Sequence, residues 1–322
     1  MTERAIIAIS DIGLVGRTDA GLQASSPAYA YTGGERLILG EAARLHAWQS
    51  PHQSYSDFWS SPGLEPLIQP HAMARNSMDL AYAHLHAVWS ELGQPAELWL
   101  AVASHQSIEF LGALRGLVAA LGVRCLGLID YSTLCAVYSS VSGEILHLDI
   151  HRREMVLTRV QRGEYTERQS IVHLPGLGLQ QLHKDLIKLL AQLFVTEHRY
   201  DPLYDGRSEQ QLYNSLPVTL ASLLDKGSAE VVLSRGAEAI TVQLSLQQWQ
   251  NLQTPGMQRM KKAVEQLEFG QAIVTERWAA LPGIGQYLSD VIALETETVL
   301  QAALAGNSLP VGDGSVFSAR LD

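Results

Sequence analysis

Two aspartates stand at the ends of short apolar runs, in a pattern suited to holding a metal ion or a phosphate. Asp149 lies near the end of the run Ile145–Ile150, and the chain returns through Met155–Val160 after a tight turn. Asp11 follows the run Ala5–Ser10 and precedes a second turn. A carboxylate at the tip of a buried strand is costly unless a partner, a metal ion or water satisfies it. An apolar strand, an aspartate and a turn therefore occur in each half of the chain.

The two aspartate turns, taken with the rest of the chain, resemble the superfamily of actin, sugar kinases and heat-shock chaperone ATPases. That superfamily has one such turn in each half, and the two turns hold the phosphates of ATP from opposite sides. Further segments resemble parts of the chaperone ATPase domain in the same order, namely Gly40–Phe58, Leu100–Tyr138, His173–Leu182, Ala280–Leu288 and Val299–Asn307. The resemblance implies a two-lobed, actin-like α/β fold with a nucleotide cleft between the lobes.

Both expected phosphate turns depart from the pattern of this superfamily. At the first turn Asp11 and Gly13 are present, but Leu14 and Val15 replace the hydroxyl residues that hold phosphate. At the second turn Asp149 is followed by bulky residues where the superfamily has glycines. Because glycine lets backbone amides approach a phosphate closely, these replacements predict weak phosphate binding.

Other expected parts of a nucleotide site are also altered. The adenosine site of the superfamily needs a Gly-Gly turn after a strand, but Thr-Glu-Arg-Trp follows Val274. The lysine that assists hydrolysis in chaperones would fall near Asp57–Trp59, where no lysine occurs. Gly176 and Gly178 precede a predicted helix over Leu179–Val195, where their amides could face an anion. We interpret these two glycines as an ordinary helix start and as the remnant of a nucleotide cleft.

Arg152 and Arg153 lie in the turn that follows Asp149. Neighbouring residues on a tight turn point in different directions, so we expect only one of the two side chains to enter the cleft. Our hypothesis is that this guanidinium takes the place of the missing cation and makes a bidentate contact to Asp11 or Asp149. The other arginine is expected to tolerate replacement by alanine.

Alternation of His147, Asp149 and His151 places these residues on one face of a strand. Imidazole and carboxylate ligands suit zinc, but a strand end with mixed polar contacts is the simpler interpretation, and we predict no metal site. Asp11 and Asp149 could similarly hold Mg²⁺ through water, or be carboxylates satisfied by the protein itself. The chain contains no Gly-x-Ser-x-Gly, Cys-x-x-Cys or Walker-type motif. We therefore predict no catalytic residue.

Composition limits the class of protein. The chain has 322 residues, of which 47% are hydrophobic, as expected for a globular protein of two domains. Its net charge of −10 argues against nucleic-acid binding. No apolar run approaches the roughly 18 residues of a membrane span, and the N-terminal residues lack the features of a signal peptide. We accordingly expect a cytoplasmic protein with no membrane contact.

Alternating strand and helix patterns predict an α/β fold of two lobes, each a mixed sheet of about five strands with flanking helices. Lobe I is expected to hold residues 1–141 and to take back a helix at 295–305, whereas lobe II holds 142–294. Residues 51–75 are predicted to be an irregular surface insertion, and 306–322 a polar tail.

Two further helices are expected in the second lobe. One covers Ser245–Glu268 and is broken or kinked near Pro255-Gly256, because proline removes a helical hydrogen bond. The other covers Gly283–Val291.

These features together predict a pseudo-ATPase: an actin-like and chaperone-like fold that acts as a protein-binding or scaffold module and needs no cofactor. The main alternative is a divergent active ATPase that binds ATP and Mg²⁺ through unusual contacts from Arg152 and Arg153. A small-molecule kinase of the same fold is a more distant alternative. The sequence leaves open the identity of the protein partner and whether the chain forms a homo-oligomer.

Overall fold

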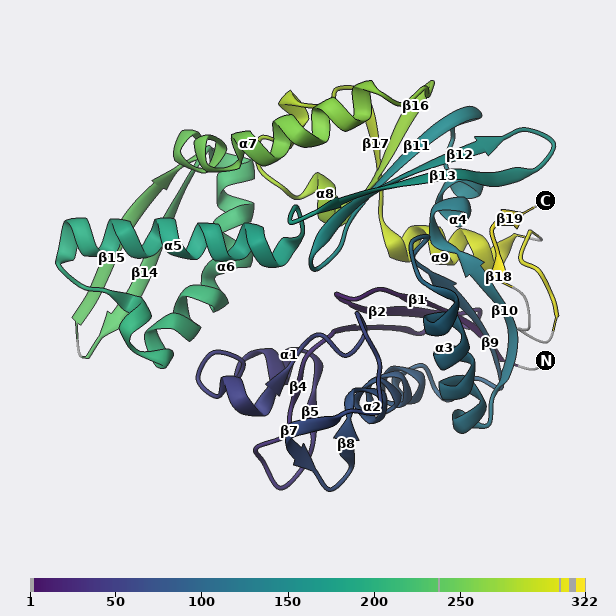
Figure 1. Ribbon diagram of the computed structural model, residues 1–322, viewed down its shortest axis with the longest axis horizontal. Coiled ribbons are helices and arrows are strands. Elements are labelled where there is room, and N and C mark those ends of the chain that lie inside the picture. Colours follow the sequence, from purple (N-terminus) through teal and green to yellow (C-terminus); the bar gives the residue numbers. More distant parts are fainter. Residues whose placement is uncertain (1–2, 237, 307, 313–316, 322) are drawn as a thin grey trace.

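The structure of the protein is a computed structural model, and it combines several mixed β-sheets with flanking helices in an α/β fold. The fold class predicted from the sequence is confirmed at that level. Figure 1 shows two large sheets, one above the other, with helices α4 (Tyr131–Tyr138) and α9 (Thr296–Ala305) between them. The structure describes residues 3–236, 238–306, 308–312 and 317–321.

The first large sheet has the strand order β18-β10-β9-β1-β2-β3. Its longer strands are β1 (Arg4–Ile9), β2 (Gly13–Thr18), β3 (Gln23–Pro27), β9 (Glu97–Val102) and β10 (Arg124–Asp130). β1, β2 and β3 form an antiparallel meander, whereas β9 lies parallel to β1 and β10 lies parallel to β9. Parallel neighbours need a crossover, which α2 (Ser77–Glu91) supplies before β9 and α3 (Ile108–Leu121) supplies before β10.

The second large sheet, β17-β16-β11-β12-β13-β19, follows the same plan. Its longer strands are β11 (Gly143–Ile150), β12 (Glu154–Arg162), β13 (Thr166–Pro175), β16 (Gln271–Thr275) and β17 (Val291–Leu294). β11, β12 and β13 form the meander, β16 lies parallel to β11, and β17 lies parallel to β16. β1 and β11 are therefore equivalent strands, and they lie in different sheets, as predicted.

Each sheet carries an insertion between its third strand and the strand that returns beside its first. The first insertion contains β4 (Ala30–Tyr31), β5 (Ile38–Leu39), α1 (Gly40–Arg44), β6 (Ser54–Tyr55), β7 (Pro66–His71) and β8 (Ala74–Asn76) before α2. The second contains α5 (Leu179–His198), α6 (Gly206–Lys226), β14 (Ser228–Arg235), β15 (Glu238–Ser245) and α7 (Leu246–Glu265). The two insertions meet where the backbone N–H of Trp48 donates to Gln210 of α6 at 2.9 Å. Figure 1 shows both on the side of the molecule away from the chain ends.

Two helix predictions for the second half need correction. The expected helix over Gly283–Val291 is replaced by a short 3-10 turn, Ile284–Gln286, and by strand β17. Gly283 and Asp290 have φ values of 76° and 57°, and such left-handed conformations interrupt a helix. α7 continues through Pro255, so the break predicted there is absent, whereas the kink given as its alternative stays a prediction.

The segment 51–75 is not simply an irregular surface insertion. It contains the strand β6, which pairs with β4, and the strand β7, and its aromatic residues Phe58 and Trp59 are only 2% and 0% exposed. The indole N–H of Trp59 donates to Nδ1 of His84 at 2.9 Å. Burial of two large rings outweighs the turn-forming tendency of the surrounding serines and prolines.

The segment 306–322 is likewise more than a polar tail. β18 (Phe317–Ser318) pairs with β10 at the edge of the first sheet, and β19 (Arg320–Leu321) pairs with β13 at the edge of the second. Leu321 is 2% exposed and packs in a core cluster that draws on both sheets. The end of the described chain therefore adds a strand to each large sheet.

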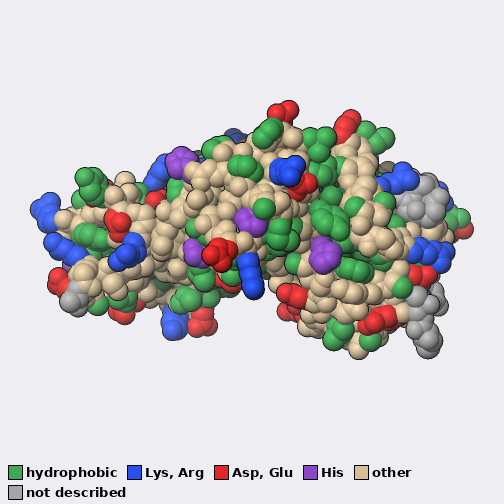
Figure 2. All heavy atoms as spheres, turned by 90° about the horizontal axis from the view of Figure 1, so that it is seen from below, with side chains coloured by type: hydrophobic (Ala, Val, Ile, Leu, Met, Phe, Trp, Pro, Cys, Tyr) green, Lys and Arg blue, Asp and Glu red, His purple; other side chains and the backbone are tan. Residues whose placement is uncertain are grey.

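Charged side chains are mixed on the molecular surface. On the face seen in Figure 2, acidic and basic side chains are interspersed with apolar ones, and no broad area of a single sign is visible. Within the described residues, no helix combines the length and the apolar character needed to cross a membrane.

Candidate functional site

The structure brings Asp11 and Asp149 together at the ends of the equivalent strands β1 and β11. The imidazole of His151 lies between them. Its Nδ1 atom is 3.3 Å from Oδ1 of Asp11, and its Nε2 atom is 3.5 Å from Oδ2 of Asp149. All three side chains are buried. One imidazole therefore contacts both carboxylates.

Asp11 also binds the backbone of the turn between β11 and β12. The N–H of Arg152 donates to both carboxylate oxygens of Asp11, each at 3.1 Å. The turn itself is closed by the N–H of His151, which donates to the carbonyl of Glu154 at 2.8 Å. These direct contacts leave no room for a phosphate between Asp11 and the amide of Arg152.

Asp149 has a second basic partner, Arg277, in the short helix α8 (Glu276–Ala279). Nη2 of Arg277 donates to the two oxygens of Asp149 at 2.9 and 3.0 Å, and Oγ1 of Thr275 donates to Oδ1 at 2.9 Å. In the sequence, this segment is distinguished only by the glycines that it lacks. The feature that indicates a role for Arg277 is its position directly after β16. That strand lies beside β11 and ends next to Asp149.

The neighbours of each group in this cluster determine its charge. Burial acts to raise the pKa of Asp149, but the charges of Arg277 and then of His151 hold that pKa well below its usual range. Burial also acts to raise the pKa of Asp11, and contacts with His151 and with the N–H of Arg152 bring it below its ordinary value. Burial acts to lower the pKa of His151, whereas Asp149 and Asp11 raise it above 6.5. The protonated imidazole is thus stabilised between two carboxylates.

The backbone amides of the first turn already have partners. The N–H groups of Ile12 and Gly13 each lie 3.3 Å from the hydroxyl oxygen of Ser10, and that of Gly13 also lies 3.3 Å from the carbonyl of Ser10. A phosphate would have to displace these contacts, whereas a phosphate-binding turn presents its amides to the ligand.

The predicted position of an arginine between the aspartates is wrong. Nε of Arg152 lies 3.5 Å from Oδ1 of Asp57, and the guanidinium lies over the ring of Tyr29. Nη2 of Arg153 lies 2.6 Å from Oδ2 of Asp57, and the side chain of Arg153 is 62% exposed. His151 takes the central position because it continues the alternation of β11 and so points to the same face as the strand's aspartate.

The start of α5 packs against the second turn. A Cβ atom on Gly178 would lie 2.3 Å from the carbonyl carbon of Arg153, so a larger residue does not fit there. The N–H groups of Leu179 and Gln180 donate to carbonyl oxygens of the turn at 2.9 Å each. These amides are used within the protein, which agrees with a helix start instead of an anion site.

The two remaining predicted glycines also have structural explanations. A Cβ atom on Gly13 would lie 2.5 Å from the carbonyl oxygen of Ser26 in β3. Gly176 has a φ of 77°, and its N–H donates to the carbonyl of Arg153 at 2.9 Å. Close strand pairing and a tight turn therefore account for these positions.

A second buried polar network, which the sequence did not indicate, surrounds His147. Nδ1 of His147 lies 2.8 Å from the hydroxyl of Ser132, and Ser104 lies 2.6 Å from Ser132 and 2.8 Å from Asp130. Asp130 in turn pairs with Arg168 at 2.7 Å. Ser132, His147 and Asp130 are 3%, 1% and 0% exposed, so this set of serine, histidine and aspartate has no access to a substrate. This polar network joins the two large sheets, because His147 belongs to β11 and Asp130 belongs to β10.

The side chains of His147, Asp149 and His151 do not meet at one point where they could bind a metal ion together. His147 faces Ser132, whereas His151 lies between the aspartates. In the part of the chain that the structure describes, no three His, Cys, Asp or Glu side chains are arranged to hold a metal ion.

A large cavity of about 790 Å³ lies beside the aspartate cluster. Its walls come from α1 and the loop that follows it, the start of α5, one face of α6, and α8 with the residues after it. Arg152 and Arg277 belong both to this lining and to the surroundings of the aspartates. The cavity is therefore the principal candidate for binding an organic molecule.

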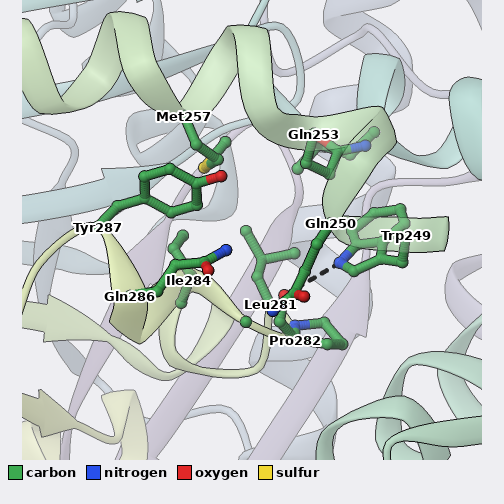
Figure 3. Close-up of a pocket in the computed structure, with 11 residues that line it drawn as sticks. Trp249, Gln250, Gln253, Met257, Leu281, Pro282, Ile284, Gln286 and Tyr287 are labelled. Atoms are coloured by element: carbon green, nitrogen blue, oxygen red, sulfur yellow. Dashed lines mark hydrogen bonds between the residues drawn. The ribbon is translucent and has the colours of Figure 1, made fainter. Parts of the chain in front are cut away.

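A second cavity, beneath α7, is too small for a ligand. Figure 3 shows Trp249, Gln253 and Tyr287 around it, with Leu281 at its base. Its volume of about 10 Å³ offers space for roughly one water molecule. The indole N–H of Trp249 donates to the carbonyl of Pro282 at 3.0 Å and closes one side.

Comparison of the sequence with models of known protein families finds no match, and a search of curated proteins finds no similar sequence.

Proposed function

We propose that this chain is a binding module without nucleotide hydrolysis, built on the two-lobed fold of actin, sugar kinases and heat-shock chaperone ATPases. The duplicated topology of the two large sheets supports the fold, as does the position of α4 and α9 between them. α9 also packs on β1 and β2, in line with its assignment to the first lobe. The lobe limits, 1–141 with 295–305 and 142–294, remain predictions.

The observation that carries the proposal is the contact of His151 with both Asp11 and Asp149. In the nucleotide-dependent members of the superfamily, the space between the equivalent aspartates holds Mg²⁺ and phosphate. Here the protein itself satisfies both carboxylates, with an imidazole, a guanidinium and a backbone N–H. A phosphate would have to break several of these buried interactions before it gained its own.

A protein partner is part of this proposal. The residues around the hairpin β7–β8 include Leu64, Ile68 and Met73, whose exposed fractions are 77%, 79% and 71%. Exposed apolar side chains in one region of a surface are typical of sites of protein–protein contact. These residues belong to the first insertion.

The proposal predicts no steady ATP hydrolysis in the presence of Mg²⁺. The measurement is phosphate release by the full chain, compared with the matched variant Asp149→Asn, which keeps the shape of the side chain and removes its charge. We expect the two rates to be equal, because the charged groups that would polarise a phosphate already bind one another within the protein. Turnover by the natural chain above that of Asp149→Asn would overturn the proposal and support a divergent ATPase.

A further inference from the structure

The large cavity has the size and lining of a site for an organic ligand. Its volume of about 790 Å³ falls within the roughly 300–1,000 Å³ that is usual for ligand pockets. Most of the lining is apolar, and it includes Leu216 and Leu220 of α6. Trp48 and Tyr213 also line it, and their rings stack with centroids 3.5 Å apart. An apolar or aromatic body would be favoured along these walls.

The charged part of the same lining is mainly basic. It contains Arg44, Arg152, Lys184 and Arg277, against the single carboxylate of Glu41 among the described lining residues. This is opposite to the protein as a whole, whose net charge is −10. A basic cavity in an acidic protein favours a ligand with negative charge.

Hydrogen bonds to carboxylates within the protein account for two of these cations, whereas Arg152 makes a longer ion pair with Asp57. Arg44 binds Glu41, with Nη2 of Arg44 2.6 Å from Oε1 of Glu41, and Arg277 binds Asp149 at 2.9 Å. Lys184 is exposed. Arg152 is therefore the buried cation in the lining with the most capacity to bind a ligand.

The surroundings of Arg152 leave part of its guanidinium unsatisfied. The residue is 9% exposed, and its Nε atom has no hydrogen-bond partner among the described residues. Oδ1 of Asp57, the ion-pair partner of Arg152, lies 3.5 Å from this nitrogen. Nε of Arg277 also lacks a hydrogen-bond partner in the described part of the chain. Buried donors without an acceptor destabilise a protein, so an acceptor supplied by a ligand would relieve that cost.

We propose that this cavity binds an amphipathic organic anion, with one carboxylate or phosphate head that accepts hydrogen bonds from Arg152 and an apolar body that lies along α6 and the Trp48–Tyr213 pair. The inference rests on the proposed function, because it gives a ligand to a cleft that does not use nucleotide. A nucleoside triphosphate fits less well. Its several negative charges would need turn amides that already have partners, such as those of Ile12 and Gly13.

The first test compares ligands on the unmodified full chain by isothermal titration calorimetry. The probes are dodecanoate, dodecyl phosphate and the neutral dodecan-1-ol, each below its aggregation concentration. We expect at least one of the two anions to bind with a stoichiometry of one, and dodecan-1-ol to bind at least about tenfold more weakly. A preference between the two anions identifies the head group. Equal binding of dodecan-1-ol, or no binding of either anion, would overturn the proposal.

The second test uses variants in matched pairs. Arg152→Met should weaken binding of the anion by about tenfold or more, whereas Arg153→Met, at the exposed neighbour, should leave it unchanged. Ala221→Trp on the lining face of α6 should occupy part of the cavity and weaken binding. Val218→Trp on the same helix, at a residue that is 70% exposed and outside the lining, should not. If Arg152→Met does not fold, the two tryptophan variants decide the outcome, and equal binding by both would overturn the proposal.

The two proposals fail in different ways. Displacement of the anion by ATP, together with ATP turnover above that of Asp149→Asn, would overturn the proposed function. Absence of anion binding without any ATP turnover would overturn only the ligand assignment.

Discussion

The side chain of His151 explains how two buried carboxylates can lie close together. An imidazole has its two nitrogens on opposite sides of a small ring, so it reaches Asp11 with one and Asp149 with the other. The longer guanidinium groups of Arg152 and Arg153 extend to Asp57 instead. At the scale of single residues, the electrostatic balance of the cluster therefore depends on one histidine and on Arg277.

The variant His151→Gln should lower the free energy of unfolding by about 3 kcal/mol near pH 6, because it leaves two buried carboxylates without their shared cation. The pKa of His151 in the folded protein is raised above 6.5. Its stabilising contribution is therefore complete below about pH 6.5 and is lost as the pH rises through the folded-state pKa. Urea unfolding of both proteins between about pH 5 and pH 9 measures the difference, which should shrink toward the alkaline end.

His173→Gln is the matched control. The side chain of His173 is 49% exposed and pairs with Glu154 at 3.1 Å, so its replacement should change stability little at any of these pH values. A stability difference for His151→Gln that stays constant with pH would contradict the assignment of a protonated imidazole.

At the scale of elements, the contact between α5 and the second aspartate turn holds the site together. Gly178 permits this contact because a Cβ atom there would overlap the backbone of Arg153. The carbonyl groups of the turn in turn accept hydrogen bonds from the first amides of the helix. The position of α5 also sets one wall of the large cavity.

We expect Gly178→Ala to lower the free energy of unfolding by about 2 kcal/mol, because the added methyl group must displace backbone atoms. Gly116→Ala in α3 is the control, since no atom lies within 4 Å of the Cβ position there. That control should be neutral or stabilising by up to about 1 kcal/mol, because alanine favours a helix more than glycine does. Thermal and urea unfolding of both variants measure the effect, and equal stabilities would show that the close contact at Gly178 is unimportant.

At the scale of the whole molecule, several contacts among the described residues join the two large sheets. α4 and α9 lie between them, the residues around His147 form a polar network, and the strands β18 and β19 extend from one sheet edge to the other. The core cluster that includes Leu321 draws on β1 and β9 as well as β11 and β16. These contacts give the two sheets one fixed arrangement around the aspartate cluster.

A chain that ends at Gly312 should lose the pairing at both sheet edges. We expect its free energy of unfolding to fall by about 2 kcal/mol or more, because the buried side chain of Leu321 is removed along with ladder hydrogen bonds. Hydrogen exchange should become faster in the edge strands β10 and β13 and stay slow in the central strands β1 and β11. Unchanged exchange at both edges would show that β18 and β19 do not stabilise the sheets.

Local patterns in the sequence determined most of the elements and the position of the two aspartates. α3 begins at its cap Ser107, whose hydroxyl accepts from the N–H of Phe110, and ends at Gly122 with a φ of 72°. Such caps and the spacing of apolar residues act over a few residues, so they can be recognised without the fold. The same holds for the strands at the two aspartates. β11 contains Asp149 and ends at Ile150 as predicted, whereas β1 ends at Ile9, one residue before the predicted end.

Only the tertiary structure decided which groups satisfy those aspartates. Arg277 lies 128 residues from Asp149 in the chain and reaches it because β16 pairs with β11. The alternation along β11 already places His151 on the same face as Asp149, but its contact with Asp11 depends on the packing of the two sheets. The burial of Trp59 and Leu321 similarly depends on contacts between distant segments, and these outweigh the polar character of the residues around them.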